Sequence, residues 1–230
     1  HVAIILDGNR RWASERSLNP TIGHYYGAEK IEDLLKWCLD LDVKSVTLYA
    51  FSTENFRRPP EEVEQIMRIA EEKLREILKN ESIHKHKVRV KAIGRLNLLP
   101  KRLQEMIRQV EESTKDYDER FLNVALAYGG RAEIVDATRK IAQKVESGNL
   151  APGDINEQLF EGYLYTAHMP KQDPDLIIRT SGEERLSGFL LWQCAYSELC
   201  FLDINWPDFR RIDLLRAVRT YQRRKRRFGQ

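Results

Sequence analysis

The feature that most constrains the fold is a short apolar run that stops at a charged turn. Residues Val2 to Leu6 are all apolar and partly β-branched, and the run ends at Asp7-Gly8-Asn9. A run of this length without polar alternation is typical of a strand that helices cover on both faces, as in a parallel sheet. Ligands of such sheets bind just beyond the carboxyl ends of the strands. Asp7 therefore lies where chemistry is expected.

The residues after this run carry donors for anions. Gly8 allows close backbone approach, and Asn9 adds an amide. Arg10 and Arg11 add guanidinium groups that suit phosphate oxygens. A carboxylate beside two arginines suggests a metal ion and a phosphate held together. The simpler alternative is a strand, an Asx turn and a helix N-cap with exposed arginines.

Strand-like and helix-like segments alternate along the chain. Short apolar runs predict further strands at 46–51, 88–93, 121–128 and 176–178. Two more apolar stretches, at 189–192 and 199–202, place Glu198 in an apolar neighbourhood. Apolar residues spaced three and four apart predict helices after Gly23-His24, from Pro60, from Pro100 to Lys115, after Gly129-Gly130, near 157–164 and from Pro207. We predict a single α/β domain over residues 1–230, with a right-handed parallel sheet flanked by helices.

The composition excludes several classes of protein. The 38 basic and 35 acidic residues nearly balance, so we expect no nucleic-acid partner. The 3 cysteines form no CxxC pair, which argues against disulfides and zinc and favours a reducing cytosol. No apolar run approaches the roughly 18 residues of a membrane span, so we expect a cytoplasmic protein. The basic segment 223–227 leaves peripheral contact with a membrane open.

Four blocks of sequence stand out in the chain. They are HVAIILDGNRRWA at 1–13, LYAFSTENFRRP at 48–59, AYGGR at 127–131 and DLIIRTSGEERLSGFLLWQCAYSEL at 175–199. In this order they resemble the cis-prenyltransferases, the undecaprenyl diphosphate synthase family. The RTSGEERLS form and the segment IGRLNLLP at 93–100 look more like the archaeal and eukaryotic branch. The resemblance covers essentially the whole chain.

The resemblance implies a fold and an activity. The fold would be the family's α/β sandwich, with an apolar tunnel between the sheet and its helices, and the assembly would be a homodimer. The enzyme would be a Mg²⁺-dependent transferase that condenses isopentenyl diphosphate with an allylic diphosphate, farnesyl or geranylgeranyl. Its product would be a long-chain cis-polyprenyl diphosphate such as undecaprenyl diphosphate.

The resemblance also implies roles for individual residues. Asp7 and Glu198 would bind Mg²⁺, a hard cation that oxygen ligands suit. Asn55 would be catalytic together with Asp7, and because an amide is a weak base we expect it to position the isopentenyl unit rather than deprotonate it. The allylic diphosphate would be bound by Gly8, Asn9, Arg10, Arg11, Trp12, His24, Ser52, Thr53, Glu54, Phe56 and Arg58. The isopentenyl diphosphate would be bound by Arg179, Arg185, Ser187, Arg227 and Gly229.

Several of these side chains have simpler explanations. His24 could cap the helix that it begins, and Glu198 could be the buried partner of an arginine. Trp12 and Phe56 could serve only in packing. An apolar stripe on the helix after Pro60 could be ordinary core rather than the lining of a channel; its members are Ile66, Ala70, Leu74 and Leu78.

The chain departs from the family pattern in two places. The family commonly has an arginine three residues before His24, where this chain has Asn19-Pro20-Thr21, so one contact to the allylic phosphate is expected to be absent or replaced. Bacterial members often have a histidine at the position of Glu184, and its replacement removes a potential metal ligand.

Other functions stay open within the family. One is a cis-prenyltransferase that makes short chains or uses an acceptor other than isopentenyl diphosphate. Another is a non-catalytic partner subunit, against which the intact Asp7, Asn55 and Arg179 argue, since a scaffold does not need two phosphate sites. The DDxxD signature of the trans-prenyltransferases is absent from the sequence.

Overall fold

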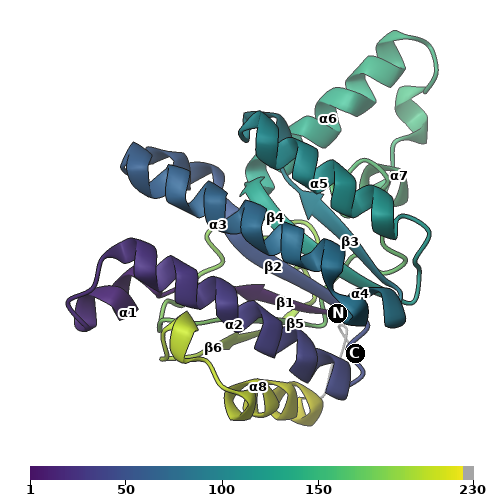
Figure 1. Cartoon of the computed structure of the whole chain (residues 1–230). Helices are drawn as coiled ribbons and strands as arrows, with labels where there is room; N and C mark the ends of the chain where they lie inside the picture. The colour runs from purple at the N-terminus through teal and green to yellow at the C-terminus, as the bar shows by residue number, and fades with distance from the viewer. Residues whose placement is uncertain (225–230) are drawn as a thin grey trace.

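A single six-stranded parallel sheet organises the computed structural model, which describes residues 1–224 (Figure 1). The strands follow the order β3-β4-β2-β1-β5-β6, so the predicted parallel α/β fold is confirmed. The strands are β1 (Val2–Ile5), β2 (Ser45–Ser52), β3 (Val88–Ile93), β4 (Arg120–Tyr128), β5 (Leu176–Arg179) and β6 (Glu198–Phe201). The α-helices are α1 (Asn9–Glu15), α2 (Pro20–Asp40), α3 (Pro60–Lys79), α4 (Glu81–Lys85), α5 (Lys101–Thr114), α6 (Gly130–Glu146), α7 (Glu157–Glu161) and α8 (Arg211–Arg223). Short 3-10 helices are η1 (Thr53–Arg57), η2 (Leu96–Leu98), η3 (Pro152–Asp154) and η4 (Trp206–Asp208).

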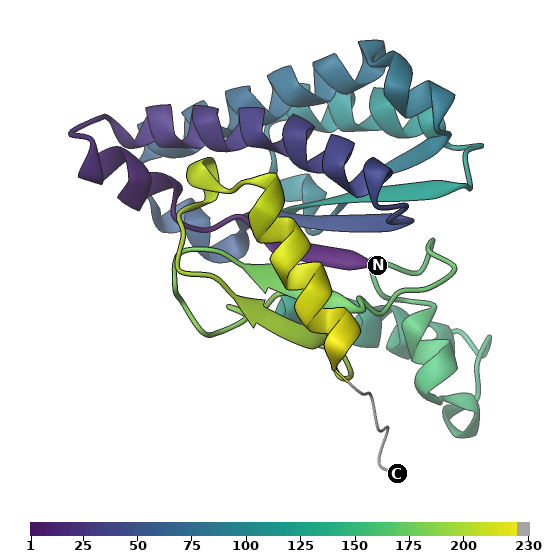
Figure 2. The ribbon, with the colours of Figure 1, turned by 90° about the horizontal axis from the view of Figure 1, so that it is seen from below.

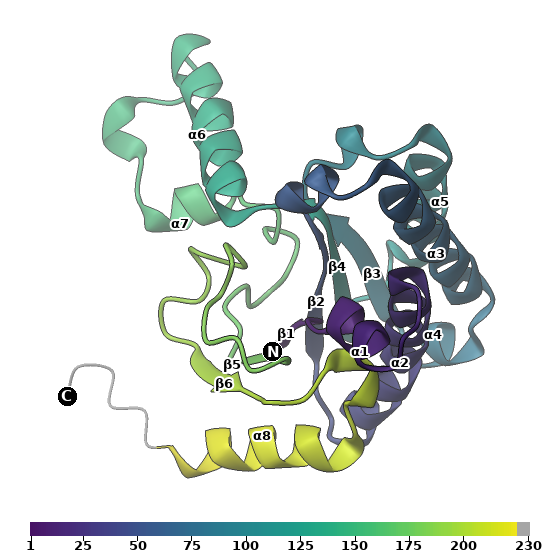
Figure 3. The ribbon, with the colours of Figure 1, turned by 90° about the vertical axis from the view of Figure 1, so that its left-hand side faces the viewer.

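The two faces of the sheet pack against different parts of the chain. Val2 and Ile4 of β1 join a core with α2, α3, α5 and α8, whereas Ala3 and Ile5 join a smaller core with Phe189 and its neighbours. This alternation is the two-residue period of a strand buried on both faces. Figures 2 and 3 show the layers, with α6 and α7 on the opposite side of the sheet from α2 to α5.

The beginning of α2 differs from the prediction. Helix α2 begins at Pro20, where Asn19 is the N-cap and its Oδ1 accepts a hydrogen bond of 2.9 Å from the amide of Thr21. Capping by an Asn side chain and proline at the first helical position are both favoured at helix starts. His24 therefore lies inside the helix, and the suggestion that it caps the helix is wrong. Helices α1 and α4 were not predicted.

The long helix α3 begins at Pro60 as the sequence predicts. Its apolar stripe faces the sheet, with Met67 and Leu74 buried in the larger core. No helix among residues 1–224 is long and apolar enough to cross a membrane.

Candidate active site

The expected functional residues gather at the carboxyl ends of β1, β2 and β5. Ile5 of β1 pairs in register with Tyr49 of β2 and with Arg179 of β5. The segments that follow these three residues therefore lie at the same edge of the sheet. They include Asp7 and the start of η1, as the rule for parallel sheets predicts.

Asp7 forms an ion pair with Arg179 across this edge. Its Oδ2 lies 2.7 Å from Nη2 and 3.2 Å from Nε of Arg179. Its Oδ1 accepts a hydrogen bond of 2.8 Å from the amide of Gly8. The Arg179 side chain is 5% exposed, and its Nη1 donates to Oγ of Ser187 at 2.9 Å and to the carbonyl of Arg185. The buried guanidinium thus connects the first strand to the segment predicted to bind isopentenyl diphosphate.

The turn after β1 depends on a glycine. Gly8 has a φ of 104°, in the region that favours glycine, and a Cβ there would lie 2.5 Å from Oδ1 of Asn205. Helix α1 begins at the next residue, Asn9, which faces the space in front of Asp7. The polar pocket around this turn is lined by Leu6, Asp7, Gly8, Asn9, Arg10, Arg11, His24 and Arg58.

A buried carboxylate that the sequence analysis missed contacts three of the basic side chains. Oε1 of Glu62 lies 3.0 Å from Nε2 of His24, 3.4 Å from Nη1 of Arg58 and 3.6 Å from Nε of Arg10. Burial lowers the pKa of His24 below its usual value, although the hydrogen bond that Glu62 accepts raises this pKa in part. Arg58 has an extended backbone before α3, which begins at Pro60, so the spacing rule for side chains on one helix does not reveal this contact.

A second carboxylate, Glu183, joins basic residues assigned to the two substrates. Its Oε1 lies 3.1 Å from Nη2 of Arg11, and its Oε2 lies 2.5 Å from Nη1 of Arg185. Arg11 also donates to the carbonyl of Ser181 at 2.6 Å. The neighbouring Glu184, where the chain departs from the bacterial pattern, is exposed. Glu183 thus brings an arginine expected at the allylic site close to one expected at the isopentenyl site.

The segment after β2 is held by its own side chains. Oδ1 of Asn55 accepts a hydrogen bond of 3.0 Å from the amide of Ser52 and closes a capping box at η1. Thr53 donates to the carboxylate of Glu54 at 3.2 Å. Phe56 packs edge-on against Phe51, with ring centroids 5.0 Å apart. The oxygen of Asn55 is therefore engaged in holding this turn.

Trp12 makes packing contacts in this structure. Its Nε1 donates to Oδ1 of Asp208 at 2.8 Å, and the guanidinium of Arg16 lies 4.4 Å from the ring centroid. The Trp12 residue is 9% exposed, and its ring lies 5.1 Å from that of Tyr26. These contacts match the simpler alternative, in which Trp12 supports α1 and α2.

Glu198 lies at the other edge of the sheet from Asp7. It begins β6 and pairs in register with Leu176, which itself pairs with Val2. Asp7 comes five residues after Val2, and at about 3.3 Å per residue this is roughly 16 Å along the strands. A single chain therefore does not bring the two proposed metal ligands together. Glu198 pairs with Arg224 instead, which matches the alternative that an arginine is its partner.

Mg²⁺ is the metal that the sequence analysis expects. Within residues 1–224 no group of three or more His, Cys, Asp or Glu side chains is placed to hold a metal ion. Asp7 is 35% exposed and presents a carboxylate beside basic side chains. One carboxylate with phosphate oxygens and water is a usual ligand set for Mg²⁺, so the donor chemistry fits. Arg227 and Gly229, expected at the isopentenyl site, lie outside the described residues.

Apolar cavities extend from the polar pocket along the sheet. The first has a volume of about 120 Å³, shares Leu6, Asn9 and His24 with the polar pocket, and lies between α2, α3 and the sheet. Ala50 faces this cavity and is exposed, although β2 lies inside the sheet. Three residues of the predicted α3 stripe, Ile66, Ala70 and Leu74, also line it.

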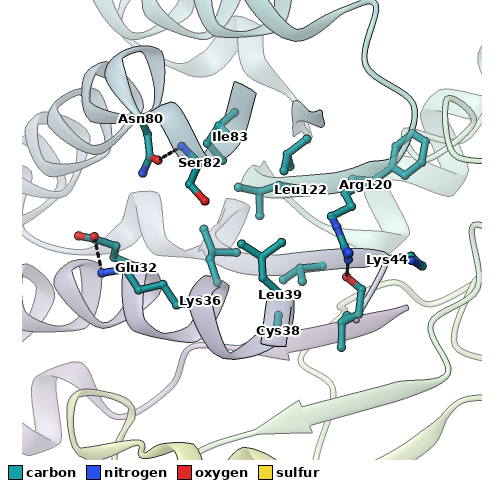
Figure 4. A pocket seen from close by; sticks show the side chains of 15 residues that line it. Glu32, Lys36, Cys38, Leu39, Lys44, Asn80, Ser82, Ile83, Arg120 and Leu122 are labelled. Atoms are coloured by element: carbon teal, nitrogen blue, oxygen red, sulfur yellow. Dashed lines mark hydrogen bonds and ion pairs between the residues drawn. The ribbon is translucent and has the colours of Figure 1, made fainter. Parts of the chain in front are cut away.

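A second cavity follows toward the amino ends of the strands. It has a volume of about 120 Å³ and shares the lining residue Leu122 with the first. Cys38, Leu39 and Ile83 line its interior, and Arg120 and Lys44 lie at one side of it (Figure 4). The first cavity thus lies beside the polar pocket, and the second lies farther from it, near the amino ends of the strands.

Comparisons with known proteins agree with this architecture. The family described as "Putative undecaprenyl diphosphate synthase" matches residues 5–229. A protein of Methanocaldococcus jannaschii, named "Tritrans,polycis-undecaprenyl-diphosphate synthase (geranylgeranyl-diphosphate specific)", is 59% identical over 229 residues, which are 100% of this chain and 82% of that protein. The crystal structure of lavandulyl diphosphate synthase from Lavandula x intermedia, in complex with dimethylallyl diphosphate, has a TM-score of 0.96 at 41% identity, covering 100% of this chain and 98% of that one. A probable undecaprenyl diphosphate synthase from Campylobacter jejuni has a TM-score of 0.80 at 33% identity, with coverage of 100% and 98%.

Proposed function

The chain belongs to the undecaprenyl diphosphate synthase family, and from this premise we propose that it elongates geranylgeranyl diphosphate with isopentenyl diphosphate to a long-chain cis-polyprenyl diphosphate. The observation that carries the proposal is a basic pocket that lies beside an apolar cavity and shares the lining residues Leu6, Asn9 and His24 with it. An allylic diphosphate has the same two parts, an anionic head and an apolar chain. Farnesyl diphosphate is the second candidate starter.

The basic side chains would bind the allylic diphosphate and stabilise its departure. Negative charge develops on the diphosphate as its bond to the allylic carbon breaks, and preorganised donors lower the barrier of such a step. Arg10, Arg11, His24 and Arg58 line or border the pocket. Mg²⁺ held by Asp7 would supply further charge neutralisation at the same oxygens.

The isopentenyl diphosphate would lie beside Arg185 and Ser187. Arg179 fixes both of these residues and Asp7 at once, so it would align the two substrates. Asn55 would position the isopentenyl unit, and the hydrogen bond of its oxygen to Ser52 supports a positioning role rather than that of a base.

The two apolar cavities would form the tunnel for the growing chain. The first cavity lies beside the basic pocket, and the second lies farther from it. Ala50, which lines the first cavity, has a small side chain that would leave room for the growing chain. A product with many isoprene units needs such an apolar path, because each buried CH₂ group contributes about 0.8 kcal/mol.

We also propose that residues 1–230 form one catalytic unit and assemble as a homodimer. Glu198 can contribute to a metal site at Asp7 only if a second chain brings it there. A long-chain product would be a lipid, so peripheral contact with a membrane remains part of the proposal.

Product analysis tests the proposal. The protein is incubated with Mg²⁺, isopentenyl diphosphate and, in separate reactions, geranylgeranyl, farnesyl or dimethylallyl diphosphate, and the products are identified by mass. We expect the highest kcat/KM with geranylgeranyl diphosphate, and long-chain products.

A second candidate function is the synthesis of a short-chain product, as the TM-score of 0.96 to lavandulyl diphosphate synthase allows. Use of dimethylallyl diphosphate alone, with a ten-carbon product, would support that function. An absence of turnover with every starter would instead support a non-catalytic partner subunit.

A further inference from the structure

We propose that Glu62 is a positioning residue for the allylic diphosphate, because it holds together three basic side chains of the pocket. The inference rests on the proposed function, since it concerns the same diphosphate. Glu62 does not line the pocket that the basic side chains surround. It therefore acts through them and not on the substrate.

The geometry places Glu62 behind the pocket. Its Oε1 lies within 3.6 Å of Arg10, His24 and Arg58, and its side chain is 8% exposed. The three partners come from α1, from α2 and from the two-residue segment between η1 and α3. One carboxylate thus joins three separate segments at the wall of the pocket. A local sequence pattern does not reveal such an arrangement.

The charges explain why an anion is needed there. Arg10 and Arg58 each lower the pKa of His24, and Arg10 also lowers that of Arg58, so the basic groups repel one another. The carboxylate of Glu62 offsets this repulsion, and it does so most strongly at His24, since both of these side chains are buried. Because a guanidinium has five N–H donors, a contact with Glu62 leaves others of Arg10 and Arg58 free to meet a phosphate.

The position of Glu62 is itself fixed by the start of α3. Its amide donates to the carbonyl of Pro59 at 3.0 Å, and Pro60 is the first residue of the helix. A carboxylate in the first turn of a helix is stabilised by the helix dipole. Rigid support of this kind is what keeps a binding site in a productive geometry.

Substitution of Glu62 tests the inference. Glu62→Gln keeps the shape of the side chain and removes its charge, so we expect the KM for geranylgeranyl diphosphate to rise about tenfold or more, equivalent to about 1.4 kcal/mol. The KM for isopentenyl diphosphate should stay within about twofold of the wild-type value. The matched control is Glu61→Gln, which removes the same charge one position earlier on α3, where the side chain is exposed. Calorimetry with inorganic diphosphate should show the same loss of binding for Glu62→Gln alone.

The outcomes separate this inference from the proposed function. If the wild-type protein binds no allylic diphosphate, the proposed function itself is wrong. If the wild-type protein is active, three results for Glu62→Gln would overturn only the positioning role. They are kinetics equal to those of Glu61→Gln, tighter binding of the allylic diphosphate, or an equal change in the KM values of both substrates. If Glu62→Gln does not fold, as thermal unfolding would show, Glu62→Asp replaces it. That variant keeps the charge on a shorter side chain, and it must raise the allylic KM selectively for the inference to stand.

Discussion

At the scale of single residues, the ion pair of Asp7 and Arg179 is the central interaction of the candidate site. Asp7 lies near the start of the chain and Arg179 is 172 residues away in the sequence. Arg179 is almost fully buried, so its charge depends on this partner and on the oxygens of Ser187 and Arg185. Asp7 thus has a structural role in addition to its proposed catalytic role.

Substitutions of Asp7 separate these two roles. Asp7→Asn keeps a hydrogen-bond acceptor for Arg179 but removes the charge for Mg²⁺, so we expect turnover to fall at least about a thousandfold. Asp7→Ala should lose the same activity and also about 3 kcal/mol of the free energy of unfolding, because it leaves Arg179 buried without its anion. Initial rates and urea unfolding measure the two effects. A tenth of the wild-type activity in either variant would refute the catalytic assignment of Asp7.

His168 gives a pH dependence of stability that is independent of the site. Burial lowers the pKa of His168 to about 4, and its Nε2 lies 2.8 Å from Oδ1 of Asn123. The unfolded chain takes up the proton at an ordinary pKa of 6.5, so stability is lost as the pH falls from about 6.5 to 4, by up to about 3 kcal/mol. Urea unfolding across this range measures the effect. His168→Gln should remove it, and an unchanged pH slope in that variant would show that other groups cause the loss.

At the scale of elements, β2 and α3 define the apolar cavity. Strand β2 carries Ala50 toward the cavity, and α3 covers it with residues such as Ile66 and Ala70. Strand β2 ends at Ser52 in the capping box of η1, so the polar segment and the cavity begin two residues apart on the same strand. A change at Ala50 should therefore affect the cavity more than the site.

We expect Ala50→Leu to shift the products to shorter chains. The larger side chain would occupy part of the cavity, while the first condensation, which uses only the basic pocket and the nearest part of the cavity, should proceed at a comparable rate. Mass analysis of the products and single-turnover kinetics with geranylgeranyl diphosphate measure the two properties. Ala151→Leu, at an exposed position, is the control. An unchanged product distribution in Ala50→Leu would indicate that the growing chain does not pass this residue.

At the scale of the whole molecule, the question is whether one chain contains a complete site. Glu198 lies at the edge of the sheet opposite Asp7. The chain ends Arg227-Phe228-Gly229-Gln230, which resembles the RxG tail that in this family reaches the isopentenyl diphosphate of the neighbouring subunit, and which lies outside the described residues. The proposed homodimer with shared sites would account for both features.

A heterodimer tests the shared site. Deletion of residues 227–230 should raise the KM for isopentenyl diphosphate much more than that for the allylic starter. Arg227 and the amide of Gly229 would donate hydrogen bonds to isopentenyl diphosphate, and the deletion removes these donors. Mixing the deleted chain with a full-length Asp7→Asn chain should then restore activity, because only a tail that acts across the dimer can complete one site. A verified heterodimer with no recovery would rule out this role of the tail.

The sequence by itself determined most of the strands, several of the helices and the edge at which the site lies. Short apolar runs and the spacing of apolar residues depend on local geometry, so they predicted the strands, α3 and the parallel sheet without knowledge of the packing. The rule that ligands bind at the carboxyl ends of parallel strands then placed Asp7, Asn55 and Arg179 at one edge.

Only the tertiary structure decided which charged groups meet. Glu62 contacts His24 across 38 residues of sequence, and Glu183 contacts Arg11 across 172. The register of β6 places Glu198 far from Asp7, although both look alike in sequence as carboxylates beside apolar strands. Such pairings depend on the order of the strands in the sheet and on how helices from distant segments pack, and a local pattern of side chains contains neither.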